Sequence, residues 1–331
     1  MQKLMISLDN NILNEGVSIV AMRMIEYGKK ERLFIIIPNK EKKSFNLSES
    51  VHVASTGGNK IAQYFRLKKM GKKIIKKENI NFITTQDPFF AGLIGRYLKN
   101  KTGATLEIQL HGDFYSSDYY KKSGLKNLIQ YYVGKWFVLK KADKIRVVGE
   151  RIRLSLLNLG ISENKIITKA IQNDPEVIES YTSNINLDDK YPNYEKTFLV
   201  LGRLEPVKNI LWLIEIFKEI LKKNNFLLLI VGMGSVEKDI EEQIKNNNLD
   251  NNIKLQNWTE NPYDYLRSAD CLLFPSLSEG YGLVAMEANV IGTKVIMNDV
   301  GVANYELKPS DKVKILPIND KEAWIQAILN I

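Results

Sequence analysis

The chain has little of the chemistry that cross-links or anchors a protein. Among its 331 residues there is a single cysteine, Cys271, so no disulfide can form within the chain. The first residues, MQKLMISLDNNIL, lack the apolar run of a signal peptide. The longest apolar runs, LFIII and FLLLIVGMG, are too short to span a bilayer and are typical of buried strands. We therefore expect a cytoplasmic protein in a reducing compartment.

Several catalytic signatures are also missing. Histidine occurs only at His52 and His111, and no group of His, Cys and Asp has zinc-ligand spacing. There is no Walker sequence, no Gly-x-Ser-x-Gly elbow and no Asp-x-Asp pair to hold a metal-bound diphosphate. The GMGS stretch is not a dinucleotide fingerprint, because Glu237 stands where the third glycine would be. We predict no metal site and no dinucleotide cofactor.

Basic residues outnumber acidic ones, which gives a net charge of +9 and favours an anionic partner. They cluster in RLKKMGKKIIKK (66–77) and in KKSGLKNLIQYYVGKWFVLKKADK (121–144), where aromatic residues are interleaved. Two interpretations stay open for these runs. They are either solvated helix faces or an attachment surface for an anionic membrane, on its inner face. No nucleic-acid motif accompanies the charge, so a nucleic-acid partner is not predicted.

Short apolar runs alternate with longer amphipathic stretches, which predicts an α/β protein with parallel sheets covered on both faces. We expect strands at 3–8, 32–38, 81–86, 105–112 and 144–149, and then at 197–203, 226–234, 253–258, 271–276, 293–298 and 312–317. Two such runs predict two doubly wound domains. The polar segment 172–196 joins them, and we place the domains at residues 1–173 and 174–331.

In such sheets ligands bind beyond the carboxyl ends of the strands, so the residues after each strand are candidate site residues. In SEGYGLVAMEA, Gly280 and Gly282 let the backbone turn tightly, and a helix begins near Gly282. The positive end of that helix suits an anion such as a diphosphate. The glycines alone fit an ordinary strand–turn–helix connection equally well.

Two further loops carry charged or titratable side chains. Arg203 and Lys208 flank the turn in GRLEPVKN, where a guanidinium fork and a compact ammonium suit phosphate. His111 follows the strand TLEIQL, and a structural role and a catalytic one are equally consistent with that position. A site drawn from loops of both halves would lie in the cleft between two domains.

The combination of loops resembles the retaining glycosyltransferases of family 4. GRLEPVKN followed about seventy residues later by ADCLLFPSLSEGYGLVAMEA is similar to their second domain, and Glu279 to Glu287 matches their E-x7-E element. The KADKIRVV and LHG stretches fit the first domain more loosely. The resemblance implies the GT-B fold, two Rossmann-like domains facing a central cleft. It places the acceptor side in domain 1–173 and nucleotide-sugar binding in domain 174–331.

The resemblance also implies roles for the residues that bind the donor, a UDP- or GDP-sugar. By analogy Arg203 and Lys208 hold the diphosphate, and Gly16 belongs to a first-domain glycine loop that faces it. Glu287 binds the ribose hydroxyls. In this family no metal or cofactor is needed, and the reaction retains the anomeric configuration by front-face attack, the leaving phosphate assisting deprotonation of the acceptor.

At the sugar end, the resemblance makes Glu279 and His111 the catalytic residues. Glu279 contacts the hydroxyls of the transferred sugar, with the backbone of Gly280, Tyr281 and Gly282 nearby, and His111 lies near the reacting carbon. Carboxylate, glycine and carboxylate would then follow the order sugar, diphosphate, ribose along one ligand. Glu287 stands among apolar residues, where a carboxylate is costly unless hydrogen-bonded, and a ribose diol supplies two donors.

The chain departs from the family's pattern at four places. Glu15 precedes Gly16 where a second glycine is frequent, and IQNDPE replaces an Asn-Gly-Val-Asp stretch. Asn257 and Trp258 stand where a glycine is common, so we expect the base contacts to differ, with Trp258 able to stack on the base. The family's final crossover helix is short or absent, so we expect weaker coupling between the domains.

The expected function is transfer of a hexose-type sugar from a nucleotide diphosphate sugar to a glycan or lipid-linked acceptor, in surface polysaccharide biosynthesis. One alternative is a sugar-nucleotide epimerase or hydrolase on the same fold. The other is a subunit that binds nucleotide sugar without catalysis, although the presence of Arg203, Lys208, Glu279 and Glu287 together argues against it.

Overall fold

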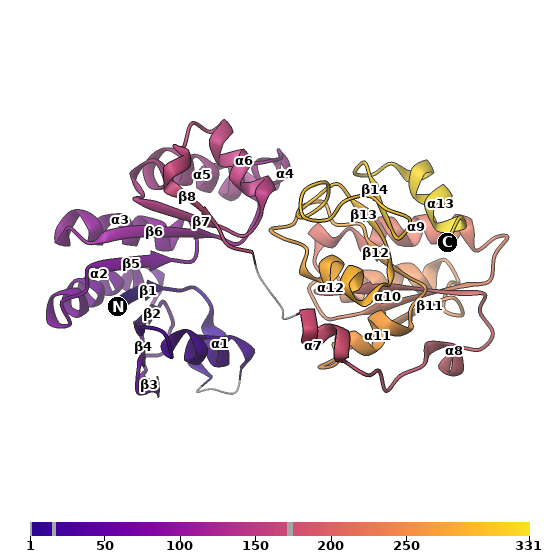
Figure 1. Ribbon diagram of the computed structural model, residues 1–331, viewed down its shortest axis with the longest axis horizontal. Coiled ribbons are helices and arrows are strands. Elements are labelled where there is room, and N and C mark those ends of the chain that lie inside the picture. The colour runs from indigo at the N-terminus through magenta and orange to yellow at the C-terminus, as the bar shows by residue number, and fades with distance from the viewer. Residues whose placement is uncertain (1, 15–17, 171–174) are drawn as a thin grey trace. The chain divides into compact units, whose positions relative to one another are not determined.

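The computed structural model describes residues 2–14, 18–170 and 175–331 (Figure 1). The chain forms two compact units. The first comprises Met1–Val148 with Ile152–Lys169, and the second comprises Gly149–Arg151 with Ala170–Ile331. The predicted boundary between residues 173 and 174 lies outside the described residues, and so does Gly16.

The first unit is built on an eight-stranded sheet in the order β3-β4-β2-β1-β5-β6-β7-β8. All neighbouring strands in it are parallel except β3 and β4, which form an antiparallel pair at one edge. The strands are β1 (Gln2–Ile6), β2 (Arg32–Ile37), β3 (Ser44–Ser48), β4 (Val51–Ser55), β5 (Phe82–Thr85), β6 (Thr105–Leu110), β7 (Lys144–Val147) and β8 (Ile166–Thr168).

Helices cover both faces of this sheet. On one face α1 packs against β2, β3 and β4, while α2, α3 and the π-helical segment η2 pack in succession on the other. The helices are η1 (Asn10–Leu13), α1 (Ile19–Gly28), α2 (Lys60–Lys77), α3 (Phe90–Thr102), α4 (Tyr119–Lys122), α5 (Leu125–Tyr132), η2 (Val133–Val138), η3 (Leu139–Lys141), α6 (Glu150–Asn158) and η4 (Glu163–Lys165).

The second unit holds a six-stranded parallel sheet in the order β11-β10-β9-β12-β13-β14. Its elements are α7 (Pro175–Ser180), α8 (Leu187–Lys190), β9 (Lys196–Leu201), η5 (Pro206–Lys208), α9 (Ile210–Ile220), β10 (Phe226–Val231), α10 (Glu237–Asn246), β11 (Ile253–Gln256), α11 (Pro262–Ser268), β12 (Cys271–Phe274), α12 (Leu283–Ile291), β13 (Lys294–Asn298), β14 (Val313–Leu316) and α13 (Lys321–Leu329).

If the strands β9 to β14 are numbered 1 to 6 along the chain, the order of the second sheet is 3-2-1-4-5-6, which is that of a Rossmann domain. The order reverses between β9 and β12, so the loops that follow these two strands diverge to opposite sides and leave a crevice between them. In the first sheet the same reversal lies between β1 and β5. The predicted pair of doubly wound α/β domains is therefore observed.

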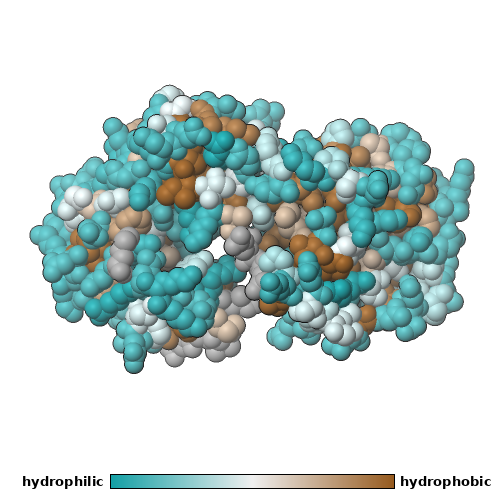
Figure 2. Space-filling model, viewed as in Figure 1, coloured by the Kyte–Doolittle hydropathy of each residue, from teal (hydrophilic) through white to brown (hydrophobic). Residues whose placement is uncertain are grey.

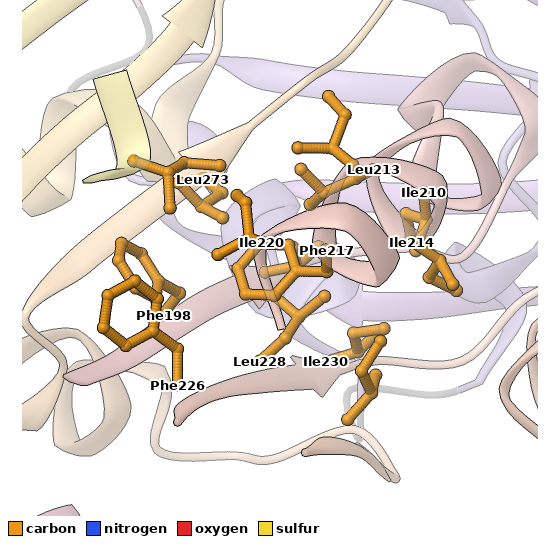
Figure 3. Packing of buried hydrophobic residues seen from close by; sticks show 14 of the residues in the cluster. Phe198, Ile210, Leu213, Ile214, Phe217, Ile220, Phe226, Leu228, Ile230 and Leu273 are labelled. Carbon is orange, nitrogen blue, oxygen red and sulfur yellow. The ribbon is translucent and has the colours of Figure 1, made fainter. Parts of the chain in front are cut away.

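The core of the second unit forms between the sheet and α9. Apolar residues recur along α9 at helical spacing and are buried, at Ile210, Leu213, Ile214, Phe217 and Ile220. They pack against Phe198, Phe226, Leu228 and Ile230 of β9 and β10 (Figure 3). Each such side chain contributes about 1.5–3 kcal/mol on burial, so α9 holds β9 and the loop after it in place.

Outside these cores the visible face of the protein is mostly hydrophilic, with a few apolar patches (Figure 2). In the part of the chain that the structure describes, no helix combines the length and apolarity needed to cross a membrane. Cys271, in β12, is fully buried.

Candidate functional site

The loops that follow β9 and β12 border the crevice of the second sheet and are joined to each other at one point. The backbone N–H of Leu277 donates to the carbonyl of Val207 at 2.8 Å, which joins the two loops directly. Pro206 opens the 3-10 turn η5, and Asn209, in the left-handed region at φ 59°, separates that turn from α9. The kink turns Lys208 away from the axis of α9 and toward the loop after β12.

Lys208 and Glu279, predicted as site residues on separate loops, form an ion pair. The Lys208 Nζ lies 2.5 Å from the Glu279 Oε1, and the two side chains are only 20% and 14% exposed. The Lys208 Nζ also lies 5.1 Å from the centroid of the Phe274 ring. Charge-assisted bonds of this length are among the stronger polar contacts in proteins. The pair therefore places a cation and a carboxylate side by side at the switch point of the second sheet, where the strand order reverses between β9 and β12.

Arg203 follows β9 and is exposed. Together with Lys208 and Ser276 it lines a cavity of about 10 Å³, room for one water molecule. The Ser276 hydroxyl is buried and has no hydrogen-bond partner among the described residues. The structure thus brings Arg203 and Lys208 to one place, as predicted.

The turn from Gly280 to Gly282 leads into α12, which begins at Leu283 as expected. Gly282 is the N-cap residue, with φ 98°, and within the described residues no side chain caps this helix end. The turn is held from the far side: the Val302 N–H donates to the Tyr281 carbonyl at 2.7 Å. A Cβ on Gly301 would lie 2.2 Å from that carbonyl oxygen, so only glycine fits there. The Ala285 and Met286 N–H groups donate to the Gly282 carbonyl at 3.0 and 3.3 Å, which leaves the N–H groups of Leu283 and Val284 for an anion.

Glu287 lies one turn into α12 and is 6% exposed. Tyr263 of α11 donates its hydroxyl to the Glu287 Oε1 at 3.3 Å. The buried carboxylate inferred from the sequence is thus observed, and part of its hydrogen bonding comes from the protein itself.

Glycines let the loops after β9 and β10 pack on each other. A Cβ on Gly232 would lie 1.9 Å from the Gly202 carbonyl oxygen, and one on Gly234 would lie 2.2 Å from that of Leu204. The Leu204 N–H donates to the Met233 carbonyl at 2.9 Å. The GMGS glycines therefore have a packing role.

His111 lies directly after β6 in the first unit. Its Nε2 is 3.1 Å from the Gln109 Oε1, and the Gln109 amide donates to Thr84 Oγ1 at 2.8 Å, so the network assigns the proton of His111 to Nε2. Part of the side chain is exposed, yet desolvation by the surrounding protein, reinforced by Arg146 and Arg23, lowers the pKa of His111 to about 4. The ring is neutral at physiological pH, and its Nδ1 is unprotonated.

Sequence reasoning missed a buried polar bridge behind the site. Asn298, at the end of β13, donates its amide to the carbonyls of Pro275 and Ser276 at 2.7 and 3.1 Å. The Trp324 Nε1 of α13 donates to the Asn298 Oδ1 at 3.0 Å. Asn298 is the last residue of the strand predicted at 293–298, so the rule that selects residues after a strand did not reach it. Tyr263 and Phe274 do not follow a predicted strand either, so the same rule did not select them as site residues.

Across residues 2–14, 18–170 and 175–331, no three His, Cys, Asp or Glu side chains are grouped closely enough to hold a metal ion. The charges that gather at the switch point of the second sheet are Arg203, Lys208 and Glu279.

Residues 183–331 match the family Glycosyl transferases group 1. The chain is 24% identical to UDP-Gal:alpha-D-GlcNAc-diphosphoundecaprenol alpha-1,3-galactosyltransferase of Escherichia coli, over 78% of this chain and 68% of that enzyme. It is 31% identical to the uncharacterized glycosyltransferase MJ1178 of Methanocaldococcus jannaschii, over 70% and 60%. The chain thus spans about two thirds of the length of these curated relatives.

Solved structures share the fold. The Anabaena protein Alr3699/HepE in complex with UDP superimposes with a TM-score of 0.73 at 14% identity, over 100% of this chain and 89% of that one. The predicted GT-B fold, with its two Rossmann-like domains, is confirmed.

Proposed function

We propose that this chain, a glycosyltransferase whose residues 183–331 match the glycosyl transferases group 1 family, moves a hexose-type sugar from a UDP- or GDP-sugar to a glycan or lipid-linked acceptor with retention of configuration. The observation that carries the proposal is the Lys208–Glu279 ion pair beside the uncapped end of α12, at the point where the strand order reverses. Surface polysaccharide assembly is the process that we assign to it.

The diphosphate of the donor is the part that most needs opposite charge. Lys208 and Arg203 line one cavity, and the first N–H groups of α12 add the positive end of a helix dipole. These groups neutralise the leaving diphosphate without a metal ion. Glu279 holds Lys208 at the edge of this site, and the ammonium turns from that carboxylate to the phosphate when the donor binds.

The two carboxylates, Glu279 and Glu287, then bind the two sugars of the donor, the transferred sugar and the ribose. Glu279, once Lys208 turns to the phosphate, accepts hydrogen bonds from hydroxyls of the transferred sugar. Glu287 accepts from the ribose hydroxyls, in exchange for or beside the bond from Tyr263. Anchoring both ends of the ligand fixes the bond that breaks between them.

In the reaction itself, the bond from the anomeric carbon to the diphosphate oxygen breaks, and the acceptor oxygen bonds to the same face of that carbon. The acceptor proton passes to the leaving phosphate oxygen. His111 is neutral above about pH 4 and so adds no charge next to the forming cationic centre. We assign it contact with the sugar, with its unprotonated Nδ1 as an acceptor.

A membrane-bound acceptor is supported by the surface of α5 and η2. Four side chains at helical spacing are exposed there, Leu125 (73%), Ile129 (56%), Tyr132 (48%) and Trp136 (49%), and we call them the α5 stripe. Hydrophobic patches among hydrophilic residues are visible over this part of the first unit (Figure 2). Such a stripe is unfavourable in water and suits the interfacial layer of a bilayer.

Lysines border the α5 stripe. The Nζ atoms of Lys140 and Lys135 lie 4.0 and 5.1 Å from the Trp136 ring centroid. Each basic residue near an anionic leaflet contributes about 1 kcal/mol. The relative from Escherichia coli is named for a diphosphoundecaprenol acceptor. We propose that the chain is cytoplasmic, lies peripherally on an anionic inner leaflet and takes a lipid-linked acceptor there.

The function is tested by incubating the protein with UDP- and GDP-sugars, with and without a polyprenyl-diphosphate-linked sugar acceptor, in the presence of EDTA. Acceptor-dependent release of nucleotide, with an α-linked product from an α-linked donor, is expected. Turnover without acceptor would favour the epimerase or hydrolase alternative. Nucleotide-sugar binding without turnover on any acceptor would favour the non-catalytic one.

The membrane part is tested by co-sedimentation with phosphatidylglycerol and phosphatidylcholine vesicles at low salt. We expect binding to the anionic vesicles that Ile129→Ser with Trp136→Ser abolishes. The matched control is Met22→Ser with Val177→Ser, which removes equally exposed apolar side chains from α1 and α7. Equal loss in both double variants, or no binding by the parent, would contradict the assignment of the α5 stripe.

A further inference from the structure

A second cavity, of about 400 Å³, lies in the first unit between α2 and the outer strands β2, β4 and β3. None of the residues so far assigned to donor or acceptor lines it. Its walls come from the face of β2, β4 and β3, from the second half of α2 and from the β3–β4 turn.

The cavity follows from the alternation of side chains in β2 and β4. Leu33 and Val53 point to the α1 side and belong to its core, so Phe34 and His52 point to the opposite face. On that face α2 packs against β1 and β2, and the adjoining part of β4 and β3 borders the cavity. Strands covered on both faces would be apolar throughout, whereas this face presents two rings, the Ser44 hydroxyl and the Asn46 amide.

The floor of the cavity is a rigid aromatic platform. The His52 Nδ1 lies 2.8 Å from the Asn46 Oδ1, and its Nε2 lies 3.3 Å from the Ser44 Oγ. Both ring nitrogens are therefore engaged, which fixes the ring plane. The Phe34 ring lies beside it, with centroids 6.2 Å apart and planes at 55°. Phe34 is only 5% exposed, and the Arg32 guanidinium carbon lies 5.2 Å from the centroid of its ring, so a ligand ring placed over this floor meets the His52 ring, which Phe34 supports from the side.

Cations converge at the open side of the cavity. Arg32 and Lys77 both approach Glu78, at 3.9 and 3.4 Å, so one carboxylate serves two cations. Lys73 has no carboxylate within 4.0 Å among the described residues. Three cationic side chains thus face two carboxylates, Glu78 and Glu49, and an anion would balance the excess.

We propose that this cavity binds a small phosphate monoester carried on a ring, of the sugar-phosphate or nucleoside-monophosphate type. The volume lies within the range of small-molecule sites. The phosphate is held by Lys73, Lys77 and Arg32, and the ring lies on His52. The site is distinct from the proposed donor site and does not depend on it, so it would be a second ligand site on the first unit.

The two histidines of the chain make the test specific. His52 forms the floor of this cavity, and His111 lies at the proposed catalytic edge of the same unit. We would follow the imidazole signals of the full chain by ¹H–¹⁵N NMR while adding glucose 1-phosphate, uridine monophosphate, glucose, uridine or inorganic phosphate. His52→Gln removes the imidazole signal of His52, so the signal that remains is assigned to His111. The expected result is a saturable shift of His52 with either phosphorylated ligand and none with glucose or uridine.

The charged wall is tested on α2 itself. We expect Lys73→Glu with Lys77→Glu to weaken binding by about tenfold or more, about 1.4 kcal/mol. Lys69→Glu with Lys76→Glu makes the same change of charge on exposed residues of the same helix outside the cavity, and should leave binding within about twofold. Shifts confined to His111, equal losses in both double variants, or equal shifts with inorganic phosphate alone would overturn the proposal. None of these outcomes bears on transfer activity.

Discussion

The Lys208 Nζ lies 2.5 Å from the Glu279 Oε1, and together these atoms link the loop after β9 to the loop after β12. A ligand that needs both a cation and a carboxylate must separate the two or insert between them. The pair offsets the charge of Lys208 and leaves Arg203 as the excess cation of the site, and the donor is proposed to exchange one internal ion pair for contacts to phosphate and sugar.

Lys208→Ala should weaken binding of the nucleotide diphosphate about tenfold or more, because a charge-assisted contact to phosphate is lost. Glu279→Gln should retain nucleotide binding and lower kcat by about 10²–10³ if the carboxylate acts on the reacting sugar. Calorimetry with UDP and GDP, followed by turnover assays, separates the two effects. Unchanged turnover in Glu279→Gln would remove this residue from the catalytic assignment.

The chain contains a matched pair for comparison. Lys321 Nζ and Glu219 Oε1 are also 2.5 Å apart, yet both side chains are nearly half exposed. A double-mutant cycle measured by urea unfolding should give a larger coupling free energy for Lys208–Glu279 than for Lys321–Glu219, since water screens the exposed pair. Equal couplings would show that burial does not strengthen the site pair.

Glu287 is expected to recognise the ribose diol. The parent should bind UDP, or GDP, at least about tenfold more tightly than the 2′,3′-dideoxy analogue, because hydrogen bonds to a charged group contribute about 1.5–3 kcal/mol. In Glu287→Gln this preference should shrink. The control is Tyr263→Phe, which removes only the hydroxyl that donates to Glu287 and should preserve the preference. An unchanged preference in Glu287→Gln would place the ribose elsewhere.

His111 should titrate near pH 4 rather than near 6.5. The folded protein then binds fewer protons than the unfolded chain between these values, so the free energy of unfolding falls as the pH falls from 6.5 toward 4. Imidazole chemical shifts measured against pH give the pKa directly. In His111→Gln the fall in stability over this range should be smaller, whereas a normal pKa near 6.5 would show that the ring is well hydrated.

Gly301 and Gly103 test how the glycine turn is held. Both have positive φ, 56° and 76°, so alanine carries the same kind of backbone cost at either. At Gly103 a Cβ meets nothing within 4 Å, whereas at Gly301 it meets the Tyr281 carbonyl at 2.2 Å and the Glu279 Cβ at 3.0 Å. Gly301→Ala should therefore lose more stability and also lose donor affinity, measured by thermal unfolding with and without UDP. Equal losses of stability and of donor affinity in Gly301→Ala and Gly103→Ala would show that the contact of Gly301 with the Tyr281 carbonyl does not support the site.

Burial predicts the behaviour of the single thiol. Cys271 is fully buried, and desolvation raises its pKa to about 12. The native protein should therefore not react with a thiol reagent such as dithionitrobenzoate, and one thiol per chain should appear on denaturation. Rapid labelling of the native state would indicate that β12, and with it the site, opens readily.

Much of the fold could be predicted because its strands are apolar runs bounded by turn residues. All eleven predicted strands occur. β3 and β4 were not predicted, since Ser44, Asn46 and His52 interrupt their apolar pattern at a sheet edge. For the same reason the cavity beside them had no signal in the sequence. β8 is three residues long and half exposed, which leaves no pattern to detect.

The candidate site was predictable in its parts and not in its contacts. The rule that ligands bind after parallel strands selected Arg203, Lys208 and Glu279 correctly as neighbours. That Lys208 would pair with Glu279 depends on β9 lying next to β12 across the reversal of strand order, which requires the sheet order. The bond from Tyr263 to Glu287 likewise depends on how α11 packs against α12.

The bridge from Trp324 through Asn298 to the carbonyls of Pro275 and Ser276 makes the Asn298 side-chain amide a reporter of local opening at the site. Because both acceptors belong to the segment that leads to Glu279, the Asn298 amide protons can exchange with solvent only when that segment lifts away. Their exchange rate in deuterated water counts these openings. A bound donor that stabilises the closed loop should slow this exchange in proportion to its occupancy. Exchange at a buried amide that does not contact the ligand would then report ligand binding.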